Sequence, residues 1–152
     1  MDDYHFVNIS DSIFVKMAYS EDMGHKYGHR YELKTEIPNG EYRVYVNDTL
    51  NLHAFIKDFK RDGNWKTYYK NGNLQSLIAY REGKMDGVMK FYYNDGQIKF
   101  EGLNKENEPV GTRNSYYQSG EIYEKDYYEN GVFVKQEVFD RNGTIKKCIS
   151  HL

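Results

Sequence analysis

The chain of 152 residues has a net charge of −2, with 21 basic and 23 acidic residues mixed along its length. This near balance argues against binding to nucleic acid or to a membrane surface through bulk charge. Hydropathy is low on average, but 16 tyrosines and 8 phenylalanines supply apolar area. Burial in a domain of this size therefore has to be largely aromatic.

Residues 1–38 stand apart from the rest of the chain, and we expect them to form an N-terminal β capping segment. Residues 13–17 are β-favouring and residues 30–37 alternate apolar with polar side chains, which predicts strands. Atypical strands of this kind protect the terminal edge of a repeat array. The first residues lack the charged and apolar regions of a secretion signal, and no stretch approaches the ~20 apolar residues of a membrane span. These features predict a cytoplasmic protein.

From residue 39 to residue 152 the sequence repeats itself. The stretch YYKNGNL at 68–74 recurs as YYNDGQI at 92–98 and as YYQSGEI at 116–122, with a step of 24 residues each time. Weaker copies are VYVNDTL at 44–50 and FDRNGTI at 139–145. Self-similarity at a fixed period indicates a tandem array.

The clearest copy contains a β-hairpin signal, because Asn71-Gly72 between β-favouring residues supplies the positive φ that a tight turn requires. Asn71 becomes Asp95 and Ser119 in the next two copies, and the first copy lacks the turn glycine. We interpret residues 70–72 as a three-residue loop closed by Tyr69 and Asn73. The same register in every copy predicts cross-strand apolar pairs. They are Tyr68/Leu74, Tyr92/Ile98, Tyr116/Ile122, Phe139/Ile145 and, in the weak first copy, Val44/Leu50. In the last copy Phe139 keeps a ring at the position of Tyr68, whereas Asp140 replaces Tyr69. We therefore expect the Tyr68 side of the sheet to be the better buried one.

A second turn returns the chain between hairpins, at Glu82-Gly83, Glu106-Asn107 and Asn130-Gly131. Two strands per repeat joined by tight turns make an antiparallel meander. The predicted fold class is therefore all-β, an elongated antiparallel β-meander of about ten strands with an open surface.

The sequence gives only weak evidence for catalytic or metal-binding residues. His25 and His29 have the spacing of metal ligands on a helix, but Gly28 between them favours a loop. Cys148 is the lone cysteine, so there is no internal disulfide and no cysteine-rich metal site. We expect no enzymatic activity, no cofactor and no bound metal.

Carboxylates and tyrosines gather in the third copy. We expect Glu124 and Asp126 to point to the same side as Ile122, with Tyr123 and Tyr127 on the other side. The candidate partner-binding residues are Glu101, Tyr123, Glu124, Asp126, Tyr127 and Glu129. One interpretation is that these charges mark solvent on a thin sheet. The other is a docking patch for a basic partner protein, such as a nuclease-type toxin.

The repeat pattern resembles the bacterial variant of the MORN repeat, the hallmark of the YwqK-type antitoxin family. The resemblance is carried by the following residues: Gly63, Trp65, Tyr68, Tyr69, Asn71, Gly72, Leu74, Tyr80, Gly83 and Gly87, then Met89, Tyr92, Tyr93, Gly96, Ile98 and Gly111. It implies a non-catalytic immunity protein that binds a cognate toxin and occludes it. The alternative is a structural or membrane-associated scaffold, although the sequence offers only Lys146-Lys147 and scattered lysines in its favour.

Overall fold

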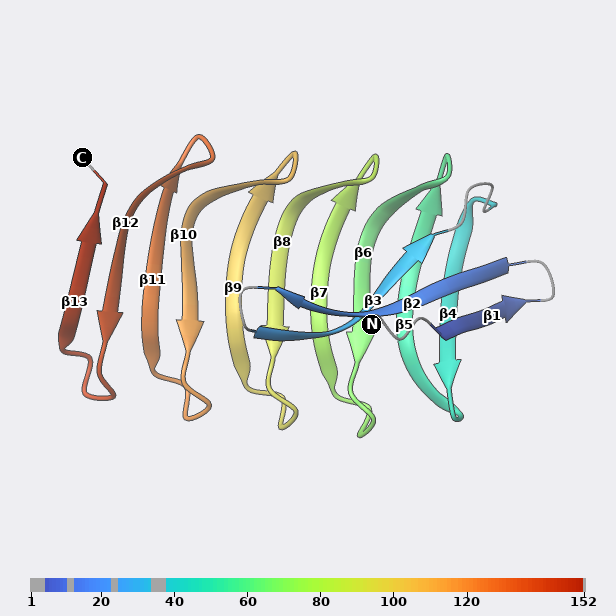
Figure 1. Cartoon of the computed structure of the whole chain (residues 1–152), viewed down its shortest axis with the longest axis horizontal. Helices are drawn as coiled ribbons and strands as arrows, with labels where there is room; N and C mark the ends of the chain where they lie inside the picture. Colours follow the sequence, from blue (N-terminus) through green and yellow to red (C-terminus); the bar gives the residue numbers. More distant parts are fainter. Residues whose placement is uncertain (1–4, 11–12, 23–24, 34–37, 152) are drawn as a thin grey trace.

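The computed structural model describes residues 5–10, 13–22, 25–33 and 38–151, with side chains from residue 38 onwards. These residues form strands and turns, with no helix among them (Figure 1). A first sheet contains β1 (His5–Ser10), β2 (Ile13–Asp22) and β3 (His25–Leu33). A second sheet contains ten strands: β4 (Gly40–Val46), β5 (Thr49–Lys57), β6 (Lys60–Tyr68), β7 (Leu74–Arg81), β8 (Lys84–Tyr92), β9 (Ile98–Lys105), β10 (Glu108–Tyr116), β11 (Ile122–Glu129), β12 (Val132–Phe139) and β13 (Ile145–Ser150).

The ten-stranded sheet is an open antiparallel meander. Each strand pairs with the next one in the chain, from β4 at one edge to β13 at the other. The strands run side by side along the whole length of the sheet (Figure 1). The predicted all-β fold class is confirmed.

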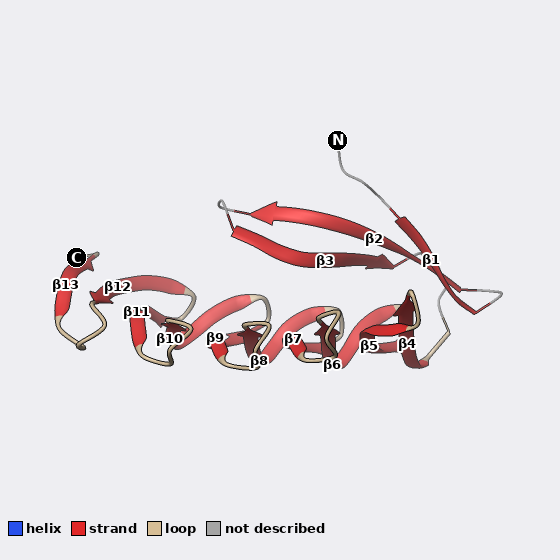
Figure 2. Cartoon of the chain, turned by 90° about the horizontal axis from the view of Figure 1, so that it is seen from below, coloured by secondary structure: helices blue, strands red, loops and turns tan. Residues whose placement is uncertain are grey.

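The N-terminal strands have a different relation to the repeats from the one expected. Residues 13–17 and 30–33 lie in β2 and β3 as predicted, whereas residues 34–37 lie outside the described part. However, β1, β2 and β3 pair only with one another, so they do not extend the sheet at β4. They lie across one face of the ten-stranded sheet (Figure 2). The segment therefore lies over a face of the sheet, and β1 contacts the edge strand β4.

The predicted hairpin turn is confirmed in detail. The Tyr69 N–H donates to Asn73 O at 2.8 Å, and the Gly72 N–H donates to Tyr69 O at 2.9 Å. Gly72 has a φ of +87°, which a glycine adopts without steric penalty. The closing hydrogen bonds recur in the next three hairpins, and four predicted pairs are present: Tyr68/Leu74, Tyr92/Ile98, Tyr116/Ile122 and Phe139/Ile145. The three predicted return turns are confirmed by the positive φ angles of their residues.

The predicted pair Val44/Leu50 in the first copy is wrong. Tyr45 pairs with Leu50, and Val44 pairs with Leu52. The physical reason is the turn: without a glycine, Asn47 and Asp48 form a two-residue turn in which both residues have positive φ. The loop is one residue shorter, so the 24-residue step misplaces the strand before it.

A β-bulge follows every hairpin and controls which face a side chain occupies. Leu74 pairs with Tyr68, but Ser76 pairs with Thr67, which leaves Gln75 as an extra residue. The equivalent extra residues in the other copies are Asn51, Lys99, Tyr123 and Lys146. Two residues that flank the bulge therefore lie on opposite faces, unlike residues two apart in a regular strand.

The two faces of the sheet differ in burial. The most buried hydrophobic side chains, at 1–6% exposed, lie on one face: Val44, Leu52, Ala54, Ile56 and Trp65. A single sheet buries side chains so completely only where a second layer packs. We call this side the covered face, because β1–β3 lie over part of it, and the other side the open face (Figure 2). Tyr68 is on the open face, so the prediction that its side is better buried is wrong.

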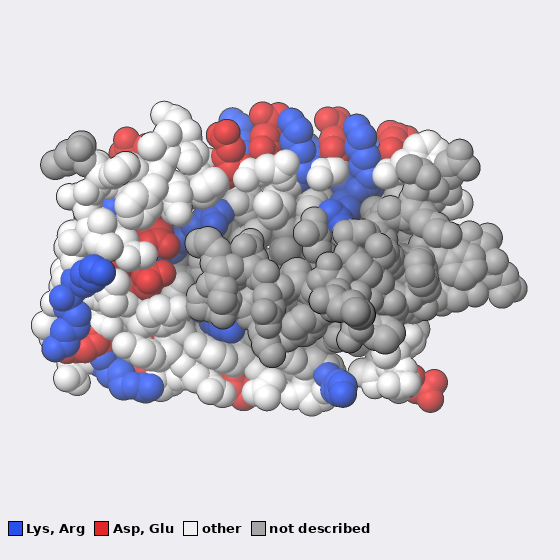
Figure 3. Space-filling view, viewed as in Figure 1, with Lys and Arg blue, Asp and Glu red and all other residues white. Residues whose placement is uncertain are grey.

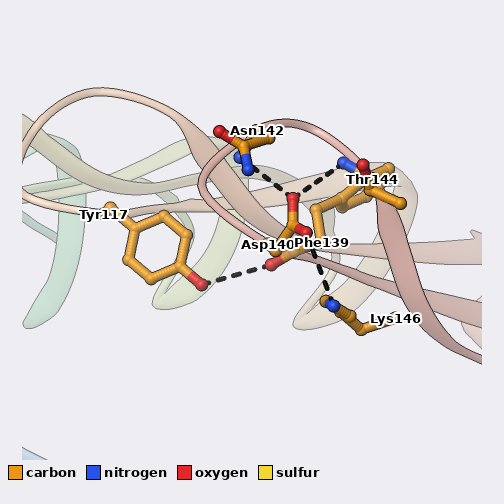
Figure 4. Close-up of polar contacts among 6 residues, drawn as sticks. All are labelled: Tyr117, Phe139, Asp140, Asn142, Thr144 and Lys146. Atoms are coloured by element: carbon orange, nitrogen blue, oxygen red, sulfur yellow. Dashed lines mark hydrogen bonds and ion pairs between the residues drawn. The ribbon is translucent and has the colours of Figure 1, made fainter.

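The second tyrosine of each pair links one repeat to the next. The hydroxyl of Tyr69 donates to Tyr92 O at 2.6 Å, and that of Tyr93 donates to Tyr116 O at 2.7 Å. The hydroxyl of Tyr117 donates to Phe139 O at 3.2 Å (Figure 4). Burial raises the pKa of the phenols of Tyr69 and Tyr93. These bonds form a tyrosine ladder in which each ring is anchored by the backbone of the following hairpin.

The tyrosine ladder ends at Asp140, which occupies the position of the second tyrosine in the last hairpin. Its carboxylate accepts the backbone N–H groups of Asn142 and Thr144, both at 2.9 Å, and lies 3.6 Å from Lys146 Nζ (Figure 4). These backbone hydrogen bonds lower the pKa of the Asp140 carboxyl. Asp140 therefore stabilises its own turn, whereas the tyrosine at the equivalent position of the earlier hairpins bonds to the next repeat.

Tyr93→Phe should reduce the free energy of unfolding by about 0.5–1.5 kcal/mol, the usual net value of one hydrogen bond. Tyr92→Phe is the matched control, because the Tyr92 hydroxyl has no partner among the described residues. Urea denaturation of the two variants and the natural protein measures the difference. Equal losses in both variants would mean that the ladder bond does not contribute to stability.

Candidate interaction surface

The structure divides the six predicted partner-binding residues between the two faces. Glu124 and Asp126 of β11 lie on the covered face, and Tyr127 lies on the open face; it is opposite the two carboxylates as predicted, but on the same side as Ile122, which was not expected. Glu101 and Glu129 also lie on the open face. The expectation that Glu124 shares the side of Ile122 is wrong, because the bulge at Tyr123 separates them.

Three of those residues join an acidic-aromatic surface on the part of the covered face formed by β10–β12. Figure 3 shows acidic and basic side chains on this part of the face. The Tyr123 ring lies 5.3 Å from the Tyr117 ring, and the Tyr128 ring lies 5.8 Å from the Phe133 ring. We define the acidic-aromatic surface by the half-buried residues Tyr117, Tyr123, Glu124, Asp126, Tyr128 and Phe133.

Arg113 lies at the border of this surface and was missed by sequence reasoning. Its guanidinium lies 5.7 Å from the Phe100 ring and 5.5 Å from the Tyr128 ring, and it donates to Asn104 Oδ1. Desolvation lowers the pKa of Arg113, and the negative charge of Asp126 partly offsets this decrease. A Cβ on Gly102 would meet Arg113 Cγ at 2.9 Å, so this glycine makes room for the arginine. The sequence signal that could have identified Arg113 is its position in the repeat, where the two preceding copies have Trp65 and Met89.

The carboxylates of the surface are held in place rather than free. Asp126 Oδ1 accepts a hydrogen bond from Gln136 Nε2 at 2.9 Å, and Arg113 is its cross-strand neighbour. At the edge of the surface, Arg141 lies over the Tyr117 ring at 4.6 Å. Ordered carboxylates beside aromatic rings can accept hydrogen bonds from a cationic side chain and pack against its aliphatic stem.

The predicted residues on the open face make contacts within the sheet. The Tyr127 hydroxyl donates to Glu137 Oε2 at 2.8 Å, which raises the pKa of Tyr127. Lys135 Nζ lies 2.8 Å from Glu137 Oε1 and 4.3 Å from the centre of the Tyr127 ring. Glu101 accepts the Tyr116 hydroxyl at 2.5 Å. Tyr127 and Glu101 therefore belong to separate clusters and not to the acidic-aromatic surface.

Metal-ligating groups do not cluster in the part of the chain with described side chains, where no three His, Cys, Asp or Glu residues come together. The side chains of His25 and His29 lie outside that part. Cys148 is exposed on β13. Across the described residues, no helix is long and apolar enough to cross a membrane.

The hairpins are linked through tyrosine hydroxyls into one open sheet whose two faces differ. This architecture defines a non-globular β-repeat protein. Residues 61–82, 85–103 and 109–130 match the MORN repeat variant family. The matches cover the hairpins β6–β7, β8–β9 and β10–β11, so these three hairpins of the array are similar to the MORN repeat variant. No curated protein sequence matches the chain.

Tyr116 gives a pH-dependent test of the open-face contacts. Burial, together with the hydrogen bond to Glu101 and the charge of that carboxylate, raises its pKa to about 12. A raised phenol pKa favours the folded state below the ordinary value of about 10, and this contribution is lost as the pH rises towards 12. Glu101→Gln should lower the pKa only in part, because burial remains. Difference absorbance of tyrosinate, with Tyr116→Phe to assign the transition, measures the shift, and an unchanged pKa in Glu101→Gln would contradict the contact.

Proposed function

We propose that the protein is a non-catalytic protein-interaction module whose acidic-aromatic surface binds a basic segment of a partner protein. MORN-variant repeats are consistent with a repeat-based scaffold for protein interactions. The observation that carries the proposal is the position of Glu124 and Asp126 among aromatic rings on a face that β1–β3 cover only in part. Aromatic residues supply contact area at low entropic cost, and carboxylates steer a cationic partner.

A toxin-neutralising role is a more specific form of this proposal. An immunity protein would bind a basic, nuclease-type toxin in the cytoplasm and block its active site by occlusion, without a cofactor. The acidic-aromatic surface has the chemistry to bind such a basic partner. The repeat match supports the interaction module and does not specify a toxin, so the general scaffold role is the better supported of the two.

The toxin form is tested by co-expression with the protein encoded beside this gene. Rescue of growth and co-purification of the two proteins are the expected results. A neighbouring protein that is toxic but neither bound nor neutralised would contradict the toxin form and leave the scaffold role to be tested with other basic partners.

The surface itself is tested with the double variant Glu124→Gln, Asp126→Asn. Both substitutions remove charge but keep an acceptor oxygen, so the hydrogen bond from Gln136 is retained. We expect at least tenfold weaker partner binding, about 1.4 kcal/mol, with a smaller loss in the free energy of unfolding, because the charge of Asp126 partly offsets the desolvation of Arg113. Glu129→Gln, an exposed position on the other face, is the matched control and should bind normally. Equal affinities for both variants in calorimetry would rule out this surface.

A further inference from the structure

The open face carries a continuous apolar stripe that the proposed function does not use. It consists of one aromatic-aliphatic pair from each hairpin. We call it the open-face stripe: Tyr45/Leu50, Tyr68/Leu74, Tyr92/Ile98, Tyr116/Ile122 and Phe139/Ile145. No described strand packs over it, because β1–β3 lie on the opposite side (Figure 2). Its ends, Tyr45 and Ile145, are 57% and 53% exposed. Contiguous exposed apolar surface of this kind marks interaction sites.

The spacing of the stripe selects the conformation of a ligand that lies along it. Its aromatic residues stand on every second strand, so successive rings are about 9.6 Å apart at ~4.8 Å per strand. A polyproline II helix advances about 9.3 Å per turn of three residues and returns to the same face. An α-helix needs seven residues, about 10.5 Å, to return near the same face. Over three intervals the mismatch is about 1 Å for polyproline II and about 3 Å for the α-helix, so the stripe favours polyproline II.

Two hydroxyls in the stripe are available to such a ligand. Those of Tyr68 and Tyr92 have no hydrogen-bond partner among the described residues, whereas the Tyr116 hydroxyl is bound to Glu101. A polyproline II segment has no internal hydrogen bonds, so all its carbonyl groups can accept. Aromatic-lined grooves recognise proline-rich segments in this way.

Charge beside the stripe defines the ligand further. Lys66 and Lys90 lie in the neighbouring row of the open face, on β6 and β8, with the same two-strand spacing as Tyr68 and Tyr92. Lys66 has no ion-pair partner among the described residues, and the nearest carboxylate to Lys90 Nζ is that of Glu101, at 4.0 Å. The equivalent positions on β10 and β12 are Asn114 and Glu137. A ligand with two carboxylates three residues apart would therefore place one beside each lysine.

We propose that the open-face stripe binds a proline-rich segment of a partner protein in the polyproline II conformation, with two acidic residues three positions apart beside Lys66 and Lys90. This site is on the opposite face from the acidic-aromatic surface. It would recognise an acidic segment, whereas the other surface would recognise a basic one.

The test uses the full chain and a synthetic peptide of repeated Pro-Pro-Glu units, with binding measured by fluorescence anisotropy. Saturable binding is expected, and the double variant Tyr68→Phe, Tyr92→Phe should bind about tenfold more weakly. That variant keeps both rings and removes only unpaired hydroxyls, so it should fold normally. Lys66→Gln should also weaken binding, and a Pro-Pro-Lys peptide should not displace the Pro-Pro-Glu peptide.

The control variant Glu124→Gln, Asp126→Asn should bind the Pro-Pro-Glu peptide normally, which separates this proposal from the proposed function. Failure of the natural protein to bind the peptide would overturn the inference. So would unchanged affinity of the Tyr68, Tyr92 double variant, or tighter binding of an acidic amphipathic helical peptide.

Discussion

The β-bulge after each hairpin is the constraint on which the surface chemistry of the protein depends. One extra residue, Gln75 in the clearest copy, moves every later side chain of that strand to the opposite face. In the third copy the extra residue is Tyr123, which puts Glu124 and Asp126 on the covered face and Tyr127 on the open one. A regular strand would have placed the two carboxylates beside Ile122, on the aromatic stripe.

The paired tyrosines have separate tasks because they point to opposite faces. The first, such as Tyr92, pairs with an aliphatic residue on the open face and leaves its hydroxyl unused. The second, such as Tyr93, turns to the covered face and bonds to the backbone of the next hairpin. A sheet whose mean hydropathy is low thus gains both apolar contact and hydrogen bonds between repeats from a single residue type.

The sequence predicted what depends on local chemistry. Asn-Gly turns at a fixed period defined the hairpins, and the register followed in the four copies whose loops contain glycine. It failed at Asn47-Asp48, where a shorter turn has the same polar character, and at the bulges, where the extra residues Gln75 and Tyr123 share no chemistry. The change to Arg113 at its repeat position did not reveal its role, because that role depends on Gly102 and on two rings brought together from other strands.

Each hydroxyl of the tyrosine ladder bonds to a backbone carbonyl 22 or 23 positions ahead, so it links its hairpin only to the adjacent one. A hairpin unit gained or lost in the interior would therefore restore an equivalent donor and acceptor on either side of the junction. Asp140 cannot take part in such an exchange, because its carboxylate is committed to its own turn. The array can change length internally while keeping a distinct terminus, and each added unit would lengthen both faces of the sheet by the same increment.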